Sequence, residues 1–209
     1  MAIRALLLDF NGTLSDDEPL LCSIFQELFA ELGKPITDGE YYDELAGLSD
    51  PEVVERWLGA PDPDVVARKI ERYRELSADG STVSTEARRA VLDAAERVAV
   101  AIVSGSARSE IEPVLKAAGL SSSITTLVAT EDVERGKPAP DGYRLALEQL
   151  GVRPEEAVAV EDSDVGIAAA KAAGLRCFAV TGTLPPDRLS AADEIIESLD
   201  PDFVRRLLA

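Results

Sequence analysis

Five residues at separate points of the chain carry the side chains that phosphoryl chemistry needs. Asp9, Ser104, Glu161 and Asp162 each end or follow a short apolar segment, and Lys137 lies in a loop rich in Gly and Pro. If the apolar segments are parallel strands, these side chains meet at the sheet edge where open α/β sheets bind ligands. Carboxylates there can hold Mg²⁺, while Ser and Lys bind phosphate oxygens. An Asp so placed can also attack phosphorus and form an aspartyl-phosphate.

Each of these signals has an ordinary structural explanation when it is taken alone. Asn11-Gly12 after an apolar segment is typical of a turn, and Ser104 before a helix is typical of an N-cap. Lys137 alone would be a solvated loop lysine, and Glu161 with Asp162 would simply favour the dipole of the following helix. Only the combination, in chain order at one predicted sheet edge, indicates a site.

The 209 residues include no histidine and only two cysteines. The lack of histidine excludes Ser-His-Asp and Cys-His nucleophile systems, imidazole zinc sites and any His general base. Cys22 and Cys177 show no CxxC spacing, and we expect both to be buried, reduced thiols. If the protein is an enzyme, its catalytic groups must therefore be carboxylates, Lys, Ser or Thr, and an oxygen-binding metal such as Mg²⁺ is compatible with them.

Short apolar segments alternate with amphipathic ones, which is the pattern of a parallel α/β sheet with helices on both faces. The predicted strands are Ile3–Asp9, Val98–Ser104, Ile124–Ala129, Ala157–Glu161, Arg176–Val180 and Glu194–Ile196. The predicted helices between them are Thr85–Arg97, Ala107–Ala118, Asp141–Leu150 and Val165–Ala173, and Asp200-Pro201 opens a last helix.

Residues 14–82, between the first two predicted strands, carry only helical patterns. An apolar stripe runs from Leu20 to Leu32, a capping box is expected at Ser49–Glu52, and Asp62-Pro63 starts a third helix. We therefore predict a helical insert, residues 14–82, and a core of residues 1–13 and 83–209. The insert holds 17 acidic and 6 basic residues, so its net charge is 6 − 17 = −11.

The whole chain is strongly acidic, with 21 Lys and Arg against 39 Asp and Glu and a net charge of −18. This sign argues against nucleic acid or an anionic membrane as a partner, because phosphate groups need a basic surface. The longest apolar run, Val98–Val103, is far too short to span a membrane, and the first residues show no secretory signal pattern. We expect a cytoplasmic, globular monomer with no nucleic-acid or membrane partner.

The four polar segments, in this order, resemble the motifs of the haloacid dehalogenase-like (HAD) superfamily over essentially the whole chain. Motif one, D-x-D-G-T, is matched by Asp9–Thr13 with one difference, and motif two by Ala101–Ser104. Lys137-Pro138 matches motif three, and Val160–Ala170 is similar to motif four. The insert resembles the C1 cap of the phosphoglucomutase-like and phosphoglycolate-phosphatase-like branch. The resemblance implies a hydrolase with a Rossmann-like core and a helical cap inserted after the first strand.

The resemblance also implies a role for each matching residue. Asp9 would be the nucleophile and a Mg²⁺ ligand, and Asn11 would offer its backbone carbonyl to the metal. Asp162, with Glu161 directly or through water, would complete the protein ligands. The transferring phosphoryl group would be bound by Thr13, Ser104, the Gly105 amide and Lys137. The cap would close over the leaving group and exclude water.

Asn11 stands where the family has the second Asp of motif one, the residue that protonates the leaving oxygen and then activates water. An amide cannot exchange a proton near neutral pH, so general acid–base assistance of about 10²–10⁴ in rate should be lost. The backbone carbonyl of Asn11 is unchanged, so metal and phosphate binding should survive. The expected site binds its ligand well and turns it over slowly.

Several explanations of Asn11 remain open at this point. Related phosphonate hydrolases use a cap lysine, but no lysine lies in Leu45–Asp50, the matching segment. Related dehalogenases have a bulky aromatic residue at the position of Asn11 and need no metal, whereas the acidic pair Glu161-Asp162 is suited to hold one. Asp16 or Asp17 could hold the water instead, if either points inward. Deamidation of Asn11 before Gly12 could also restore a carboxylate.

The sequence thus predicts a Mg²⁺-dependent phosphatase that hydrolyses a small phosphate monoester slowly through an aspartyl-phosphate. The alternative is a catalytically impaired HAD-fold protein that binds a phosphorylated ligand. Mutases of this branch carry a cap His and Arg, and here there is no His and Asp50 stands near the place of that Arg. The insert's negative charge should repel polyanionic leaving groups, so we expect a small phosphorylated metabolite with a neutral or cationic remainder. Arg56 and Arg72 are the insert cations that could face it.

Overall fold

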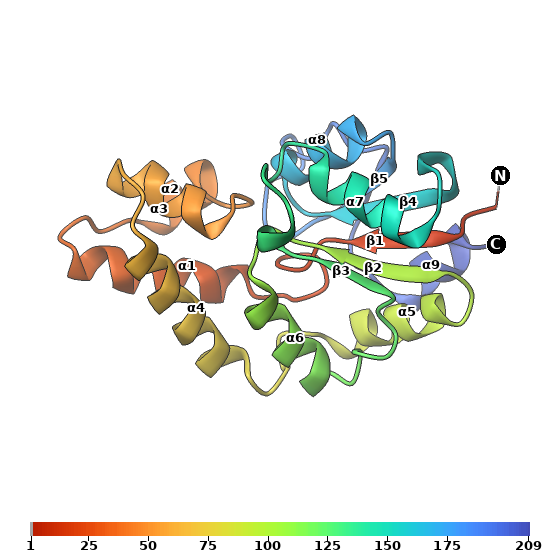
Figure 1. Cartoon of the computed structure of the whole chain (residues 1–209), viewed down its shortest axis with the longest axis horizontal. Helices are drawn as coiled ribbons and strands as arrows, with labels where there is room; N and C mark the ends of the chain where they lie inside the picture. Colours follow the sequence, from red (N-terminus) through yellow and green to blue (C-terminus); the bar gives the residue numbers. More distant parts are fainter. Residues whose placement is uncertain (1) are drawn as a thin grey trace.

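A six-stranded, fully parallel sheet in the order β3-β2-β1-β4-β5-β6 forms the centre of the computed structural model, which describes residues 2–209 (Figure 1). The strands are β1 Ala5–Leu8, β2 Ala99–Val103, β3 Thr126–Val128, β4 Ala157–Glu161, β5 Arg176–Val180 and β6 Glu194–Ile196. The predicted α/β class is therefore confirmed. The last three strands have the predicted bounds, and the first three are shorter than predicted at their ends.

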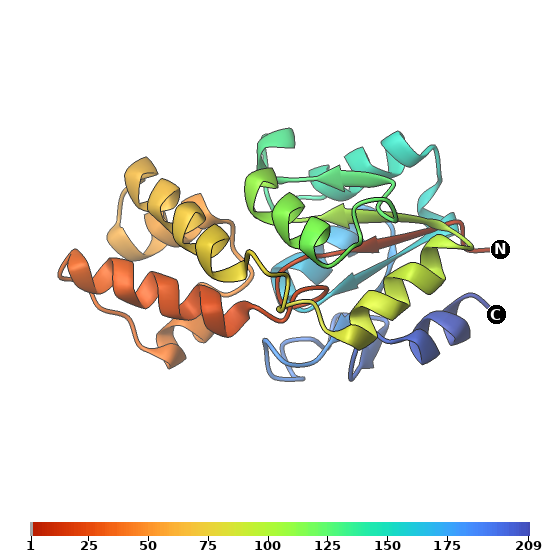
Figure 2. The ribbon, with the colours of Figure 1, turned by 90° about the horizontal axis from the view of Figure 1, so that it is seen from below.

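Helices cover both faces of this sheet. The helices are α1 Glu18–Glu31, α2 Asp38–Glu44, α3 Asp50–Leu58, α4 Pro63–Ser77, α5 Thr85–Ala95, α6 Arg108–Ala117, α7 Asp141–Leu150, α8 Asp164–Ala172 and α9 Pro201–Leu207. In Figure 1, α7 and α8 lie on one face, and Figure 2 shows α5, α6 and α9 in front of the other. Within residues 2–209, no helix combines the length and the apolar character needed to cross a membrane.

The two central strands are buried along their whole length, as expected for a parallel sheet covered on both faces. Every residue of Ala5–Leu8 and of Ala157–Glu161 is buried. Leu8 pairs in register with Ile102 on one side and Val160 on the other. The polar residues that follow these positions therefore emerge at the same level, at the carboxyl edge of the sheet.

Helices α1 to α4 lie beyond this carboxyl edge, and both chain termini lie at the opposite end of the sheet (Figures 1 and 2). Aromatic rings pack α1 against α3: the centroids of Phe29 and Trp57 are 6.3 Å apart, and Phe25 stacks on Phe29 within α1 at 5.4 Å. Three of the four helices were predicted. Sequence reasoning missed α2, although the capping box of Thr37 and Glu40 marks its start.

Residues 14–82 leave and rejoin the rest of the chain side by side. The Ser15 hydroxyl donates to the Thr82 hydroxyl at 2.8 Å, and the Asp16 N–H donates to the Thr82 carbonyl, also at 2.8 Å.

Cys22 and Cys177 are both buried and form no disulfide, as predicted.

A buried ion cluster joins the insert to the core. Lys69 of α4 lies 2.8 Å from Asp50 of α3 and 2.8 Å from Glu110 of α6, and its side chain is fully buried. Burial raises the pKa of Glu110 to about 7, against the lowering effect of Lys69. Although burial opposes it, the two carboxylates hold the pKa of Lys69 above its ordinary value. The ammonium is therefore the charge that makes this acidic junction stable.

We expect Lys69→Met to lower the free energy of unfolding by about 3–5 kcal/mol, because it leaves Asp50 and Glu110 buried without a cation. Arg68→Met is the control, since the neighbouring Arg68 pairs with Glu31 at the surface, and it should change stability by no more than about 0.5 kcal/mol. Urea unfolding of both variants measures the difference. Equal losses would show that the buried cluster does not stabilise the junction.

Candidate active site

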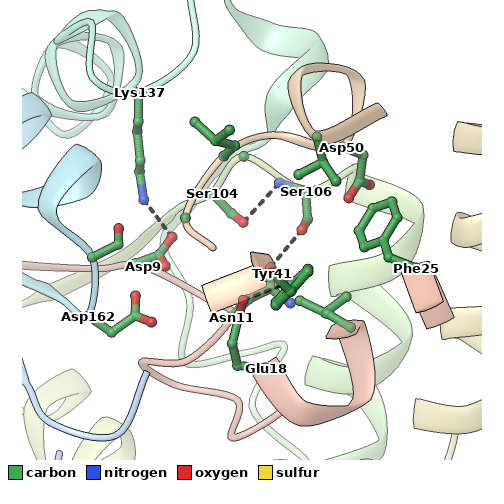
Figure 3. Close-up of a pocket in the computed structure, with 16 residues that line it drawn as sticks. Asp9, Asn11, Glu18, Phe25, Tyr41, Asp50, Ser104, Ser106, Lys137 and Asp162 are labelled. Atoms are coloured by element: carbon green, nitrogen blue, oxygen red, sulfur yellow. Dashed lines mark hydrogen bonds and ion pairs between the residues drawn. The ribbon is translucent and has the colours of Figure 1, made fainter. Parts of the chain in front are cut away.

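A small cavity lies between the carboxyl edge of the sheet and the helical insert (Figure 3). Six of the predicted site residues line it: Asp9, Asn11, Ser104, Gly105, Lys137 and Asp162. The insert closes the other side with Glu18, Phe25, Tyr41, Asp50 and Val53, among others. The cavity volume is about 40 Å³, whereas pockets that hold small molecules measure roughly 300–1,000 Å³. The space between the sheet edge and the insert is therefore small in this conformation.

Lys137 holds the predicted nucleophile in place. Its Nζ lies 2.6 Å from Asp9 Oδ1 and 2.6 Å from Glu161 Oε1, and the Tyr143 hydroxyl also donates to Glu161. Burial raises the pKa of Glu161 to about 7, while Lys137 opposes this shift. Burial acts against the ammonium as well, but Asp9 and Glu161 raise the pKa of Lys137 above its ordinary value. A positive charge is thus fixed beside Asp9.

Three buried carboxylates beside Lys137 form a group of oxygen ligands. Asp9, Glu161 and Asp162 each place one carboxylate oxygen within 4.8 Å of the others. Glu161 Oε2 is buried and has no hydrogen-bond partner among residues 2–209. Burial, reinforced by the Asp9 carboxylate, raises the pKa of Asp162 well above its ordinary value. Hard oxygen ligands and an orphaned carboxylate oxygen fit a bound Mg²⁺.

Two glycines make room for these carboxylates. A Cβ atom on Gly12 would lie 1.9 Å from Asp162 Oδ2, and one on Gly166 would lie 1.9 Å from Glu161 Oε2. Gly12 also has a φ of +72°, which side chains other than glycine rarely adopt. Both positions therefore require glycine if the carboxylates are to approach one another.

The segment after β2 supplies two hydroxyl groups to the cavity. Ser104 Oγ accepts the Ser106 N–H at 3.1 Å, so the hydroxyl proton of Ser104 stays available to a ligand. The Ser106 hydroxyl donates to Asn11 Oδ1 at 2.6 Å. Ser106 was not predicted as a site residue, because a second serine before a helix carries no distinctive sequence signal.

Asn11 is held on both sides of its amide. While its oxygen accepts from Ser106, its Nδ2 donates to Asp17 Oδ2 at 2.9 Å. Asp17 also accepts the Gly12 N–H at 3.3 Å and the hydroxyl of Tyr73. Of the two acids that sequence reasoning left open, Asp17 is buried beside Asn11, whereas Asp16 is exposed.

Other predicted residues lie outside the cavity lining. The Thr13 hydroxyl donates to Asp162 Oδ1 at 3.4 Å, and Glu161 lies behind Lys137. Arg56 and Arg72 are exposed, and Arg72 pairs with Glu27 on the surface. Neither arginine faces the site. Sequence reasoning also missed Glu18 and Tyr41, because periodicity alone does not show which polar residues of the insert point toward the sheet.

Known proteins resemble this chain in sequence and in fold. The family model of haloacid dehalogenase-like hydrolases matches residues 6–180. Protein CbbY of Cereibacter sphaeroides is 35% identical, over 94% of this chain and 92% of that protein. The phosphorylated carbohydrates phosphatase of Thermotoga maritima is 28% identical, over 99% and 98%. A mutant CbbY from Rhodobacter sphaeroides, crystallised with xylulose-1,5-bisphosphate, superposes with a TM-score of 0.85 at 33% identity, covering 94% of this chain and 95% of that one.

The fold and the site define a hydrolase that acts on phosphate esters. The chain belongs to the haloacid dehalogenase-like hydrolase family, as its four motifs predicted.

Asp17 should make stability depend on pH. Burial raises its pKa from 3.8 to about 6, so the folded state favours the protonated form, and this contribution is lost as pH rises from about 4 through 6. We therefore expect Asp17→Asn to become more stable relative to the native chain over that interval, by up to about 3 kcal/mol. Asp16→Asn, at an exposed position, should show no such trend in urea unfolding, and a flat difference for both variants would contradict the expectation.

Proposed function

We propose that this enzyme is a Mg²⁺-dependent phosphatase that hydrolyses a small phosphate monoester through an aspartyl-phosphate on Asp9. The observation that carries the proposal is the position of Asp9, which lines the cavity with Lys137 2.6 Å away and two further carboxylates beside it. Asp9 is the one carboxylate of that group that directly follows β1 and has both a fixed cation and access to the cavity.

In the first step, an Asp9 oxygen attacks phosphorus and the bond from phosphorus to the leaving oxygen breaks. In the second, water attacks the same phosphorus, which releases phosphate and restores the Asp9 carboxylate. Lys137 offsets the repulsion between Asp9 and the phosphoryl oxygens, and the free hydroxyl proton of Ser104 and the Gly105 amide bind those oxygens. Thr13 supports this arrangement through Asp162.

Asp9, Asp162, Glu161 and the Asn11 backbone carbonyl are the groups that would hold Mg²⁺. When bound, the ion would neutralise charge on the phosphoryl group and lower the barrier to attack by an anion. Lys137 alone cannot balance three carboxylates and a phosphate, so the site has reason to take up a divalent cation.

Residues 14–82 would act as a cap over a core of residues 1–13 and 83–209. A cavity of about 40 Å³ is small for a phosphate ester, so we expect the insert to move away from the sheet edge when substrate enters and product leaves. The Ser15–Thr82 contact, where the chain passes between the two parts, is the place where such a motion would be hinged.

Slow turnover follows from Asn11. Its amide has no proton to transfer, and both of its polar atoms are already bound by Ser106 and Asp17. The same observation favours a second candidate function, binding of a phosphorylated ligand without turnover. A chain that binds phosphate at Asp9 and Lys137 but releases none from any ester would support that candidate.

We further propose that the enzyme is a cytoplasmic monomer.

Asp9→Asn should abolish phosphate release, because the amide cannot form the phosphoenzyme. We expect the loss to exceed about 10³-fold, while Asp16→Asn, on the exposed neighbouring segment, stays within about twofold. Colorimetric phosphate assays over a panel of sugar, polyol and amine-bearing monoesters measure this and rank the esters. Activity retained by Asp9→Asn would overturn the proposed mechanism.

Gly12→Ala should weaken Mg²⁺ binding by tenfold or more, because its Cβ would displace the Asp162 carboxylate. Gly33→Ala is a matched control: its φ of +73° nearly equals the +72° of Gly12, yet no atom lies within 4 Å of its Cβ. Both variants carry the cost of an alanine at positive φ, about 1 kcal/mol, so only Gly12→Ala should change the calorimetric Mg²⁺ titration. Equal affinities would mean that Asp162 does not bind the ion.

A further inference from the structure

An alkoxide leaving group needs a proton, and motif one cannot supply it here. The Asn11 amide faces the Ser106 hydroxyl with its oxygen and Asp17 with its nitrogen. Asp17 itself is not part of the cavity lining. Changing Asn11 alone to Asp would place two carboxylates at the present distance of 2.9 Å, so this structure favours an amide at position 11.

Most of the carboxyl groups that line the cavity are already engaged by other groups. Asp9 is the nucleophile, Lys137 is bound to Asp9 and Glu161, and Asp162 belongs to the carboxylate group. Asp50 has both oxygens engaged by Lys69, at 2.8 and 2.9 Å. Within the described part of the chain, Glu18 is the remaining carboxyl group that lines the cavity. Among residues 2–209 it forms no ion pair, and it does not belong to the group of Asp9, Glu161 and Asp162.

Glu18 is well placed for proton transfer. It is the first residue of α1, is 6% exposed, and lines the cavity together with Asp9 and Asn11. The Tyr41 hydroxyl donates to its Oε1 at 2.9 Å, which orients the carboxyl group and leaves Oε2 for a proton. In Figure 3, Lys137 enters the cavity from above, and Glu18 lies on the side away from it, near Asn11. Nucleophile and proton donor thus approach from different sides.

We propose that Glu18 is the general acid and base of this enzyme, in the role that Asn11 cannot fill. This inference rests on the proposed phosphatase function. The protonated Glu18 carboxyl gives its proton to the leaving oxygen as the bond to phosphorus breaks, and an alcohol departs. The Glu18 carboxylate then takes a proton from the water that attacks the aspartyl-phosphate. Glu18 ends protonated, so each turnover consumes one ester and one water.

The charges around Glu18 suit this role. Burial is the main cause that raises its pKa to about 7, and the carboxylates of Asp17 and Asp9 act in the same direction. The hydrogen bond from Tyr41 and the charge of Lys69 lower the pKa and limit the rise. Both protonation states are therefore populated near neutral pH, which a group that alternates between acid and base requires.

The test compares two esters with different leaving groups. Glycerol phosphate releases an alkoxide that needs a proton, whereas p-nitrophenyl phosphate releases a phenolate that does not. We expect Glu18→Gln to slow glycerol phosphate turnover by about 10²-fold or more. With p-nitrophenyl phosphate, the first turnover should change less than threefold, and a burst of nitrophenolate should precede a slow steady state, because water activation is lost. Glu27→Gln, on the exposed side of the same helix, should leave both reactions unchanged.

A rescue variant separates proton transfer from a structural role. In the exchange Asn11→Asp/Asp17→Asn, an acid at position 11 faces an amide, so a carboxyl proton is again available there. In this background, Glu18→Gln should cost less than threefold with glycerol phosphate. The native chain should also lose glycerol phosphate turnover at high pH, and Glu18→Gln should lack this pH dependence.

Three results would overturn the inference. An equal loss for both esters, first turnover included, would make Glu18 a structural or binding residue, and a loss confined to amine-bearing esters would make it an ammonium ligand. Full activity of Glu18→Gln in an active native chain would show that the proton comes from elsewhere. Failure of the proposed function looks different: neither the native chain nor the exchange variant would release phosphate from any ester.

Discussion

The accumulation of negative charge at one sheet edge is the constraint on which the rest of the structure depends. Asp9, Glu161 and Asp162 place carboxylate oxygens within 4.8 Å of one another in a protein of net charge −18. Such a group is stable only with a cation among it, and Lys137 supplies one at 2.6 Å from two of the three. The need for close approach also explains why Gly12 lies next to the cluster. A phosphate ester enters a site whose charges are already fixed.

A second balance of charge explains why Asn11 stands in place of the second Asp of motif one. Asn11 and Asp17 form an amide–carboxylate pair, in which the amide donates to the acid at 2.9 Å. Two acids at this distance would have to share a proton. The Asp17 carboxyl therefore explains an amide at position 11 in physical terms, and the loss of a proton donor there is a consequence. Within the described chain, the remaining carboxyl group that lines the cavity without pairing with a cation belongs to Glu18, the first residue of α1.

The insert contributes more than a cover. It brings Glu18, Tyr41 and Phe25 against the sheet edge and closes the cavity to about 40 Å³. Its contact with the core is partly ionic, because Lys69 joins Asp50 to Glu110 across the junction. No cation of the insert lines the cavity among residues 2–209. A leaving group with a second phosphate would therefore meet acidic and apolar groups without a partner, which supports the proposal of a small phosphate monoester as substrate.

The sequence by itself determined the parallel sheet, the described helices other than α2 and the four polar segments at the strand ends, because apolar periodicity, caps and strand ends are local properties. It also located the one abnormal position, Asn11. Only the tertiary structure decided that Asp17 points inward and Asp16 outward, that the Ser106 and Asp17 side chains fix the Asn11 amide, and that Glu18 reaches the cavity. These facts depend on how α1 packs against the sheet edge. For two acidic residues that are neighbours in the sequence, the sequence alone does not show which one will be buried.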